Sequence, residues 1–209
     1  MGAALRRQGY QVALLTDAQA SYKGMRDALD AFSRMLGPGG VAFFFFSGHG
    51  MRGHEGHNYL LPVEGVSHYR DLSTDALSLE RVNKRLVGSK CLLHVVVADA
   101  CRSDAPRMVS ETKAALPKGF AVMAAAPAEV GSIMSYSCDP GEVSWDGAGG
   151  GRNGAFTTAL LRHIGTPGLH VETVFTRAAK DCQELTRHHE KPQSPWKMAN
   201  LTHEHVCLF

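Results

Sequence analysis

A histidine and a cysteine each follow a run of apolar residues in this sequence. His49 lies in the stretch Ser47–Gly50, directly after Val41–Phe46, and Cys101 follows the apolar run Leu92–Ala98. A continuous apolar run bounded by glycine or polar residues is typical of a strand buried on both faces of a parallel sheet. Because active residues of such sheets collect beyond the carboxyl ends of the strands, the pattern predicts that the two side chains meet at one edge.

This pair of residue types is what a thiol nucleophile requires. The thiolate is the attacking species, and a nearby imidazole lowers the pKa of the thiol and carries the proton. Gly48 and Gly50 flank His49 and allow a close backbone approach to a substrate, and the N–H groups of Gly50 and Cys101 are candidates for an oxyanion hole. A buried cysteine alone is usually an inert core residue, and a histidine alone in a Gly-rich turn is usually solvated. The prediction of a Cys-His dyad therefore depends on the two occurring together.

The elements that must position these residues alternate between strands and helices. Apolar periodicity predicts helices over residues 2–8, 21–36, 78–87, 155–164 and 171–184. Apolar runs predict strands over residues 10–15, 41–46, 59–63, 92–98, 132–138 and 206–209. Such alternation is typical of an α/β fold with a mostly parallel sheet covered by helices on both faces. A length of 209 residues fits a single domain over 1–209.

Composition and charge exclude several classes of function. The net charge is +2 with no basic cluster, so we expect no nucleic-acid partner, and no apolar run is long enough to span a membrane. Five irregularly spaced cysteines do not form a disulfide framework, and they fit a reducing, cytoplasmic compartment. His49, His54, His57 and Glu55 do not have the spacing of a helical zinc site, so no metal is expected. No phosphate loop is present either, and we expect no cofactor.

At this point the motifs resemble those of a known family. The stretch Phe44–Gly50 resembles the histidine motif of metacaspases, paracaspases and their bacterial relatives, and Ala98–Arg102 resembles their cysteine motif. Further stretches similar to the family are Ser135–Cys138, Pro140-Gly141, Asp146-Gly147, Arg152–Thr157 and Gln193–Trp196. The resemblance runs from about residue 10 to the end of the chain. It implies a caspase-like three-layer sandwich and the activity of a cysteine endopeptidase, a thiol protease.

The chain departs from the family pattern in two ways. Family members usually begin with a strand, interior to the sheet, and an acidic loop that supplies one acid to the substrate pocket. By comparison with that pattern, this chain is expected to start inside the following helix. The missing strand makes a catalytically inactive caspase-like module for interaction or scaffolding the alternative function. The second departure concerns metal ions. The acidic cluster of calcium-dependent metacaspases has no counterpart after His49, so no calcium requirement is inferred.

The resemblance also implies a substrate preference. Caspases use a Gln two positions before the nucleophile to bind Asp, but this chain has Asp99, and a carboxylate there attracts Arg or Lys and repels Asp. The resemblance adds Ser47 to this pocket and Asp146 as a second acid, with Asp139 as the alternative. We therefore expect protein or peptide substrates with a basic residue before the scissile bond. Asp99 has another interpretation as a helix-capping or turn residue, and the sequence leaves dimerisation and self-processing open.

Overall fold

The computed structural model describes residues 1–89, 91–101, 120–121, 123, 131–139, 142, 144–145, 153–203 and 206–209, with the backbone only for Cys101. Its helices are α1 (Gly2–Arg7), α2 (Tyr22–Met35), α3 (Leu72–Asp75), α4 (Leu79–Val87), α5 (Ala155–His163) and α6 (Val171–Leu185), with 3-10 turns at Asp17–Ala20 and Tyr69–Asp71. Its strands are β1 (Val41–Arg52), β2 (Asn58–Leu60), β3 (Leu77–Ser78), β4 (Leu93–Cys101), β5 (Gly131–Tyr136) and β6 (Trp196–Asn200).

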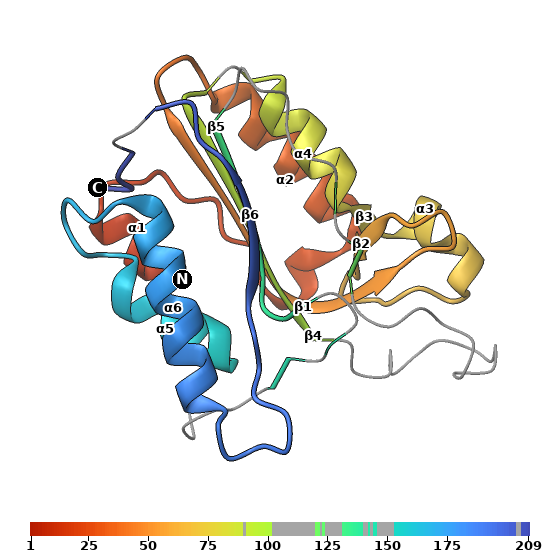
Figure 1. Cartoon of the computed structure of the whole chain (residues 1–209). Helices are drawn as coiled ribbons and strands as arrows, with labels where there is room; N and C mark the ends of the chain where they lie inside the picture. Colours follow the sequence, from red (N-terminus) through yellow and green to blue (C-terminus); the bar gives the residue numbers. More distant parts are fainter. Residues whose placement is uncertain are drawn as a thin grey trace.

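These strands form one mixed sheet with helices on both faces. The strand order is β3-β2-β1-β4-β5-β6, and β1, β4 and β5 are parallel while the remaining pairings are antiparallel. Figure 1 shows α1, α5 and α6 on one side of the sheet, and α2 and α4 on the other. The predicted α/β fold, a three-layer sandwich with a mostly parallel core, is confirmed.

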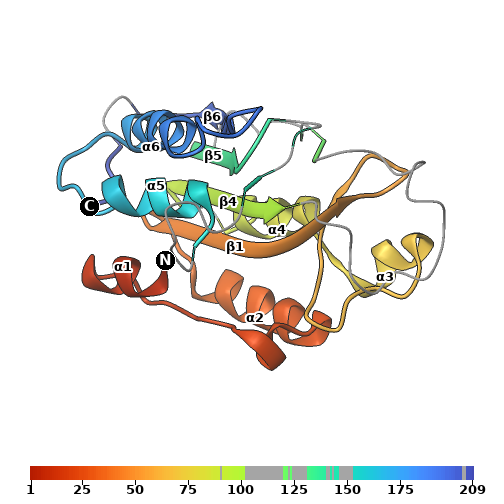
Figure 2. The same cartoon turned by 90° about the horizontal axis from the view of Figure 1, so that it is seen from below.

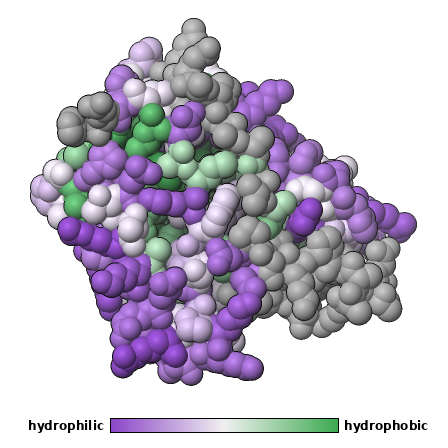
Figure 3. All heavy atoms as spheres, in the orientation of Figure 1, coloured by the Kyte–Doolittle hydropathy of each residue, from purple (hydrophilic) through white to green (hydrophobic). Residues whose placement is uncertain are grey.

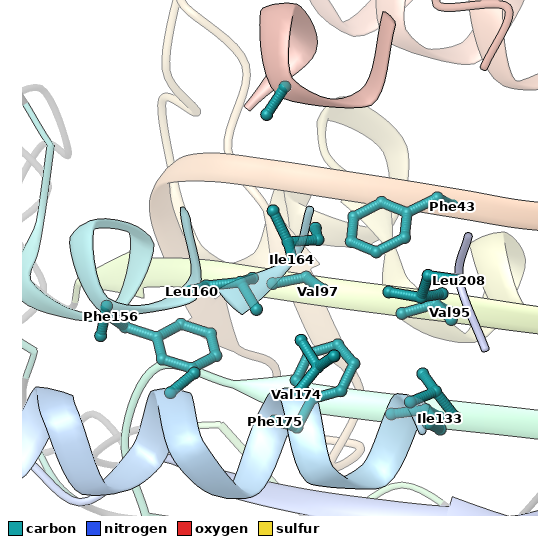
Figure 4. Close-up of a cluster of buried hydrophobic side chains, with 14 of the residues drawn as sticks. Phe43, Val95, Val97, Ile133, Phe156, Leu160, Ile164, Val174, Phe175 and Leu208 are labelled. Atoms are coloured by element: carbon teal, nitrogen blue, oxygen red, sulfur yellow. The ribbon is translucent and has the colours of Figure 1, made fainter. Parts of the chain in front are cut away.

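One core lies between the sheet and the layer of α1, α5 and α6. Alternate residues of the central strands point into it, because successive side chains of a strand face opposite sides of the sheet. Figure 4 shows Phe43 of β1, Val95 and Val97 of β4 and Ile133 of β5 facing Phe175 and other apolar side chains of α5 and α6. The same alternation carries the odd-numbered positions of β1 and β4 along this face toward their carboxyl ends.

The second core lies between the sheet and the layer of α2 and α4. Even-numbered positions such as Val96 and Ala98 pack there against Leu29 of α2 and Leu86 of α4. Both helices begin at a serine whose hydroxyl accepts a first-turn N–H, Ser21 from Gly24 and Ser78 from Arg81, each at 3.1 Å. Side-chain acceptors at these positions satisfy N–H groups that have no partner within the helix. Burial on both faces explains why the central strands are continuous apolar runs.

Two strand predictions are wrong, and the edge strand β6 was not predicted. Residues 10–15 form no strand, although Tyr10 and Val12 pack against the first core, because they have no ladder partner among the described residues. The sequence prediction of a strand at 206–209 is also wrong: Cys207 makes only an isolated bridge with His170. The strand at the edge of the sheet beside β5 is β6. Its five residues show too weak an alternation of apolar and polar side chains to predict a strand from the sequence.

The two sides of β1 are paired unequally. Its residues 41–49 pair with β4, and its last residues, 50–52, pair with β2, so no described strand pairs with its outer edge before Gly50. Figure 2 shows the connection from α1 to α2 passing on the β1 side of the sheet. The strand that the family resemblance places inside the sheet is therefore not found among the described residues.

The surface in Figure 3 is mainly hydrophilic, with apolar atoms gathered around β6, where the sheet ends. Over the described part of the chain, no helix combines the length and the apolar character that a bilayer span requires.

His94 on β4 makes the stability of this fold depend on pH. It is fully buried, and its Nε2 lies 3.1 Å from Oδ1 of Asn83, so the neutral ring donates there. Burial lowers the pKa of His94 from 6.5 to about 4. The unfolded chain therefore binds a proton as the pH falls below 6.5, whereas the folded chain does not until about pH 4. We expect this residue to reduce the free energy of unfolding by about 3 kcal/mol between pH 7 and pH 4.

The substitution His94→Gln tests this expectation, since an amide donates to Asn83 but does not titrate. Urea unfolding at several pH values should show a shallower loss of stability toward pH 4 in the variant than in the wild-type protein. Identical pH dependence in both proteins would contradict the assignment.

Candidate active site

The parallel ladder between β1 and β4 ends at the two residues expected to do chemistry. Its last Cα partners are His49 and Cys101, and two positions earlier Ser47 pairs with Asp99. Both strands run in the same direction, so their carboxyl ends reach the same edge of the sheet (Figure 1). The structure therefore brings four sequence-predicted positions together as two adjacent register pairs.

His49 lies within β1 and not after its end, which corrects the sequence prediction of a strand over residues 41–46. β1 continues to Arg52 because its last residues form an antiparallel ladder with β2, and the backbone O of His49 accepts the N–H of Leu61 at 2.9 Å. The His49 side chain is half-buried. A histidine at this position is carried by regular backbone hydrogen bonding, which makes its location more precise than a loop would.

Gly50 follows His49 at the point where β1 passes from β4 to β2. The hydrogen bond from Leu61 to His49 makes Gly50 and Leu60 a non-hydrogen-bonded pair, so the N–H of Gly50 points away from β2 and toward the β4 side. A Cβ at this position would lie 2.2 Å from Cζ of Phe120 and 3.1 Å from Cβ of Ala100. Only glycine fits between these neighbours without displacing a ring.

Asp99 is held by the first turn of α5. It is 7% exposed, and its Oδ2 accepts the backbone N–H of Thr157 at 3.2 Å and also the Thr157 hydroxyl. Helix N-termini have unpaired N–H groups and a positive partial charge, so a carboxylate is stabilised there. The residue before the helix is Gly154, which has no side chain to serve as a cap. Asp99, from β4, supplies the missing acceptor to the first turn of α5. It therefore caps this helix through a tertiary contact.

The sequence matches the caspase domain over residues 1–206. The chain belongs to the caspase domain family. Among solved structures, one of a protein from Geobacter sulfurreducens is similar, with a TM-score of 0.65 and 18% identity, covering 97% of this chain and 82% of that chain. At this identity the likeness is evidence for the fold alone. No curated protein matches the sequence.

In this caspase domain, Asn58 anchors a short segment beside the end of the sheet. Its side-chain amide donates to the O of Ala121 at 2.8 Å and accepts the N–H of Ala121 at 2.6 Å, while its own N–H donates to Oε1 of Glu80 at 3.2 Å. The ring of Phe120 then packs against Gly50 and lies 5.7 Å from the ring of Tyr136. Asn58 is fully buried, and sequence reasoning missed it because its partner lies 63 positions away.

The three buried thiols that the structure describes, Cys91, Cys138 and Cys182, are poorly suited to act as nucleophiles. Cys182 is fully buried, and burial, with smaller effects of Asp99 and Cys138, raises its pKa to about 12. A thiol with such a pKa carries almost no thiolate at neutral pH. Cys91 and Cys138 are also buried, as expected of cysteines that pack in the core.

The second acid of the predicted pocket is not located. Asp146 lies outside the described residues, and the half-buried Asp139 is placed just after β5, where its O accepts the N–H of Glu142 at 3.0 Å. Within the described ranges, no group of three His, Cys, Asp or Glu side chains is arranged to hold a metal ion.

Sequence reasoning also missed the roles of Thr157, which contacts Asp99, and of Gln193, which contacts Ser137 and Trp145. Thr157 and Gln193 both lie in stretches that resemble the family, Arg152–Thr157 and Gln193–Trp196, but the resemblance assigned them no role. Their contacts join segments far apart in the chain, 58 positions from Asp99 to Thr157 and 56 from Ser137 to Gln193. Residue type and spacing carry no signal for such pairs.

Proposed function

We propose that this caspase domain is a cysteine endopeptidase that cleaves peptide bonds after Arg or Lys. The observation that carries the proposal is the pairing of His49 with Cys101 at the end of the parallel β1–β4 ladder. In parallel strands that pair in register, partner positions belong to the same face of the sheet. Partner positions on one face of neighbouring strands are the placement expected of a nucleophile and its base, which supports the proposed dyad.

In the proposed reaction, Cys101 attacks the scissile carbonyl as a thiolate, and its proton resides on His49. The tetrahedral oxyanion is stabilised by backbone N–H groups of Gly50 and Cys101. The direction of the Gly50 N–H, away from β2 and toward β4, supports its assignment to this role. His49 then protonates the leaving amine, and water hydrolyses the acyl-enzyme to release the second product and restore the thiol.

The preference for a basic residue depends on the second register pair. Asp99 is a nearly buried carboxylate two positions before Cys101, and the exposed Ser47 is its partner on β1. A carboxylate out of bulk water attracts a guanidinium or ammonium group strongly and repels the side chain of Asp. We assign Asp146 to the same pocket as a second acid, with Asp139 as the alternative.

Covalent labelling tests the proposal directly. We expect a peptide electrophile with Arg at the reactive carbonyl to label the wild-type protein stoichiometrically and the Cys101→Ala variant not at all. The matched control is Cys207→Ala, since Cys207 is the most exposed of the four thiols that the structure describes in full. This variant should label like the wild-type protein. An otherwise identical electrophile with Asp should label at least about 100-fold more slowly, because Asp99 repels it. Faster labelling by the Asp reagent would refute the basic preference.

The alternative is a catalytically inactive caspase-like module for interaction or scaffolding. The observation that favours it is the outer edge of β1, which has no ladder partner before Gly50 among the described residues. Intact mass spectrometry together with circular dichroism separates the two functions. A folded wild-type protein that shows no adduct with either electrophile would favour the module and exclude the peptidase.

A further inference from the structure

Gln193 connects both ends of the segment that follows β5. It lies between α6 and β6 and is 2% exposed. Its Nε2 donates to the O of Ser137 at 2.6 Å, and its Oε1 accepts the N–H of Trp145 at 2.7 Å. Its own backbone N–H donates to the hydroxyl of the buried Thr186 at 2.9 Å, which fixes Gln193 to the end of α6. One amide side chain therefore holds two points of the chain that are eight residues apart in sequence.

Both of these points connect in turn to Asp99. On one side, the N–H of Ser137 donates to the O of Ala98 at 3.1 Å, next to Asp99 on β4. On the other side, the O of Trp145 accepts the N–H of Ala155 at 3.2 Å, in the first turn of α5. That turn holds the Asp99 carboxylate through Thr157. The hydrogen bonds form a closed circuit that contains Gln193 at one end and Asp99 at the other.

The segment between α6 and β6 supports this circuit with further contacts to the same chain region. The indole of Trp145 stacks on the ring of His189 with centroids 4.0 Å apart and an angle of 4°, and its Nε1 donates to the O of Lys191 at 3.2 Å. Lys191 also forms an ion pair with Glu142. The contacts of Gln193 are the buried part of this interface, where hydrogen bonds are least exposed to competition from water.

We propose that Gln193 is a positioning residue for substrate binding, which holds Asp99 in place through the strand that carries it and the helix that caps it. The inference deepens the proposed function, since it assumes that Asp99 binds the basic side chain of the substrate. An amide suits this position because it donates to Ser137 and accepts from Trp145 at the same time. Gln193 is not in the register pairs of the active site, so its loss should affect substrate binding and spare proton transfer.

The variant Gln193→Glu tests the proposal through its pH dependence. At pH 7.5 a carboxylate accepts from Trp145 but cannot donate to the O of Ser137. We expect KM for an Arg-containing peptide to rise about tenfold at this pH while kcat stays within about threefold of wild type. As the pH falls toward 5, the buried carboxyl group takes up a proton and regains a donor, so the ratio of the two KM values should approach one.

Two variants serve as controls for this experiment. Gln193→Leu has no donor at any pH, so its KM should stay raised throughout. Gln183→Glu introduces the same charge on the exposed end of α6 and should keep the wild-type KM. Thermal unfolding of each variant distinguishes a loss of folded protein from a displacement of Asp99 in a folded protein. A wild-type KM for Gln193→Glu at pH 7.5, or a fall in kcat without a change in KM, would overturn the inference.

A measurement without substrate separates failure of this inference from failure of the proposed function. In a Trp196→Phe background, Trp145 is the only tryptophan of the chain. We expect Gln193→Leu to raise the acrylamide quenching constant of Trp145 about twofold, because the backbone N–H of Trp145 loses its acceptor and the indole is held less firmly. Unchanged quenching overturns the positioning role whether or not the protein hydrolyses peptides. If the wild-type protein does not hydrolyse the peptide but Gln193→Leu increases the quenching of Trp145, the proposed peptidase function is wrong. The hydrogen-bond circuit around Asp99 is then still supported.

Discussion

Replacing His49 with alanine should lower kcat/KM for a peptide with Arg before the scissile bond by about 1,000-fold. Proton transfer by a positioned side chain contributes about 100- to 10,000-fold to a rate. Here the same imidazole is also proposed to favour the thiolate of Cys101, its register partner. The measurement is steady-state hydrolysis with active-site titration, so that a loss of folded enzyme is not read as a loss of rate.

His57→Ala is the matched control for this result. His57 is an exposed histidine in the loop after β1, near the Glu55 carboxylate at 4.0 Å and outside the β1–β4 register pairs. Its replacement should leave kcat/KM within about twofold of wild type. A His49→Ala variant that keeps more than a tenth of the wild-type value, or that behaves like His57→Ala, would show that His49 does not transfer the proton.

Two substitutions of Asp99, to alanine and to asparagine, should separate its effect on the stability of the protein from its effect on substrate specificity. In Asp99→Ala the first turn of α5 loses the acceptor for the N–H and the hydroxyl of Thr157, so we expect a loss of about 2–3 kcal/mol in the free energy of unfolding. In Asp99→Asn an amide oxygen still accepts, so the loss should be about 1 kcal/mol. The charge, however, is removed in both variants.

The proposed substrate role of Asp99 depends on that charge. We expect the wild-type protein to prefer an Arg peptide over its citrulline analogue, which keeps the shape of the side chain without the charge, by about 100-fold in kcat/KM. Asp99→Asn should reduce this preference to near one while the protein remains folded. Equal preference in the wild-type protein and in Asp99→Asn would show that Asp99 only caps α5.

Thr157→Val completes the test, because it removes the hydroxyl donor and keeps the carboxylate and the backbone N–H. We expect a loss of about 1 kcal/mol in the free energy of unfolding and an unchanged preference for Arg over citrulline. If Thr157→Val also abolished the preference, the hydroxyl of Thr157 as well as its backbone N–H would be needed to hold the carboxylate in place.

The strand predictions succeeded where burial alone decides the structure and were wrong where pairing decides it. The runs that became β1 and β4 pack against a core on each face of the sheet, with the run in β4 fully buried and the run in β1 partly buried, so any partner arrangement favours an extended backbone there. Residues 10–15 have similar apolar character but no ladder partner among the described residues, and strand propensity depends on such neighbours. β6 shows the opposite case, since it is a strand through its pairing with β5 and not through its own pattern.

The sequence by itself determined that a histidine and a cysteine follow two buried strands, and that an acid precedes the cysteine by two positions. Those properties depend on residue type and on the two-residue period of a strand, which are local. Only the tertiary structure decided that His49 and Cys101 are register partners, that α5 holds Asp99, and that Gln193 closes the circuit around it. Register and these hydrogen bonds join segments tens of residues apart, and they form only when the whole sheet and both helical layers pack together.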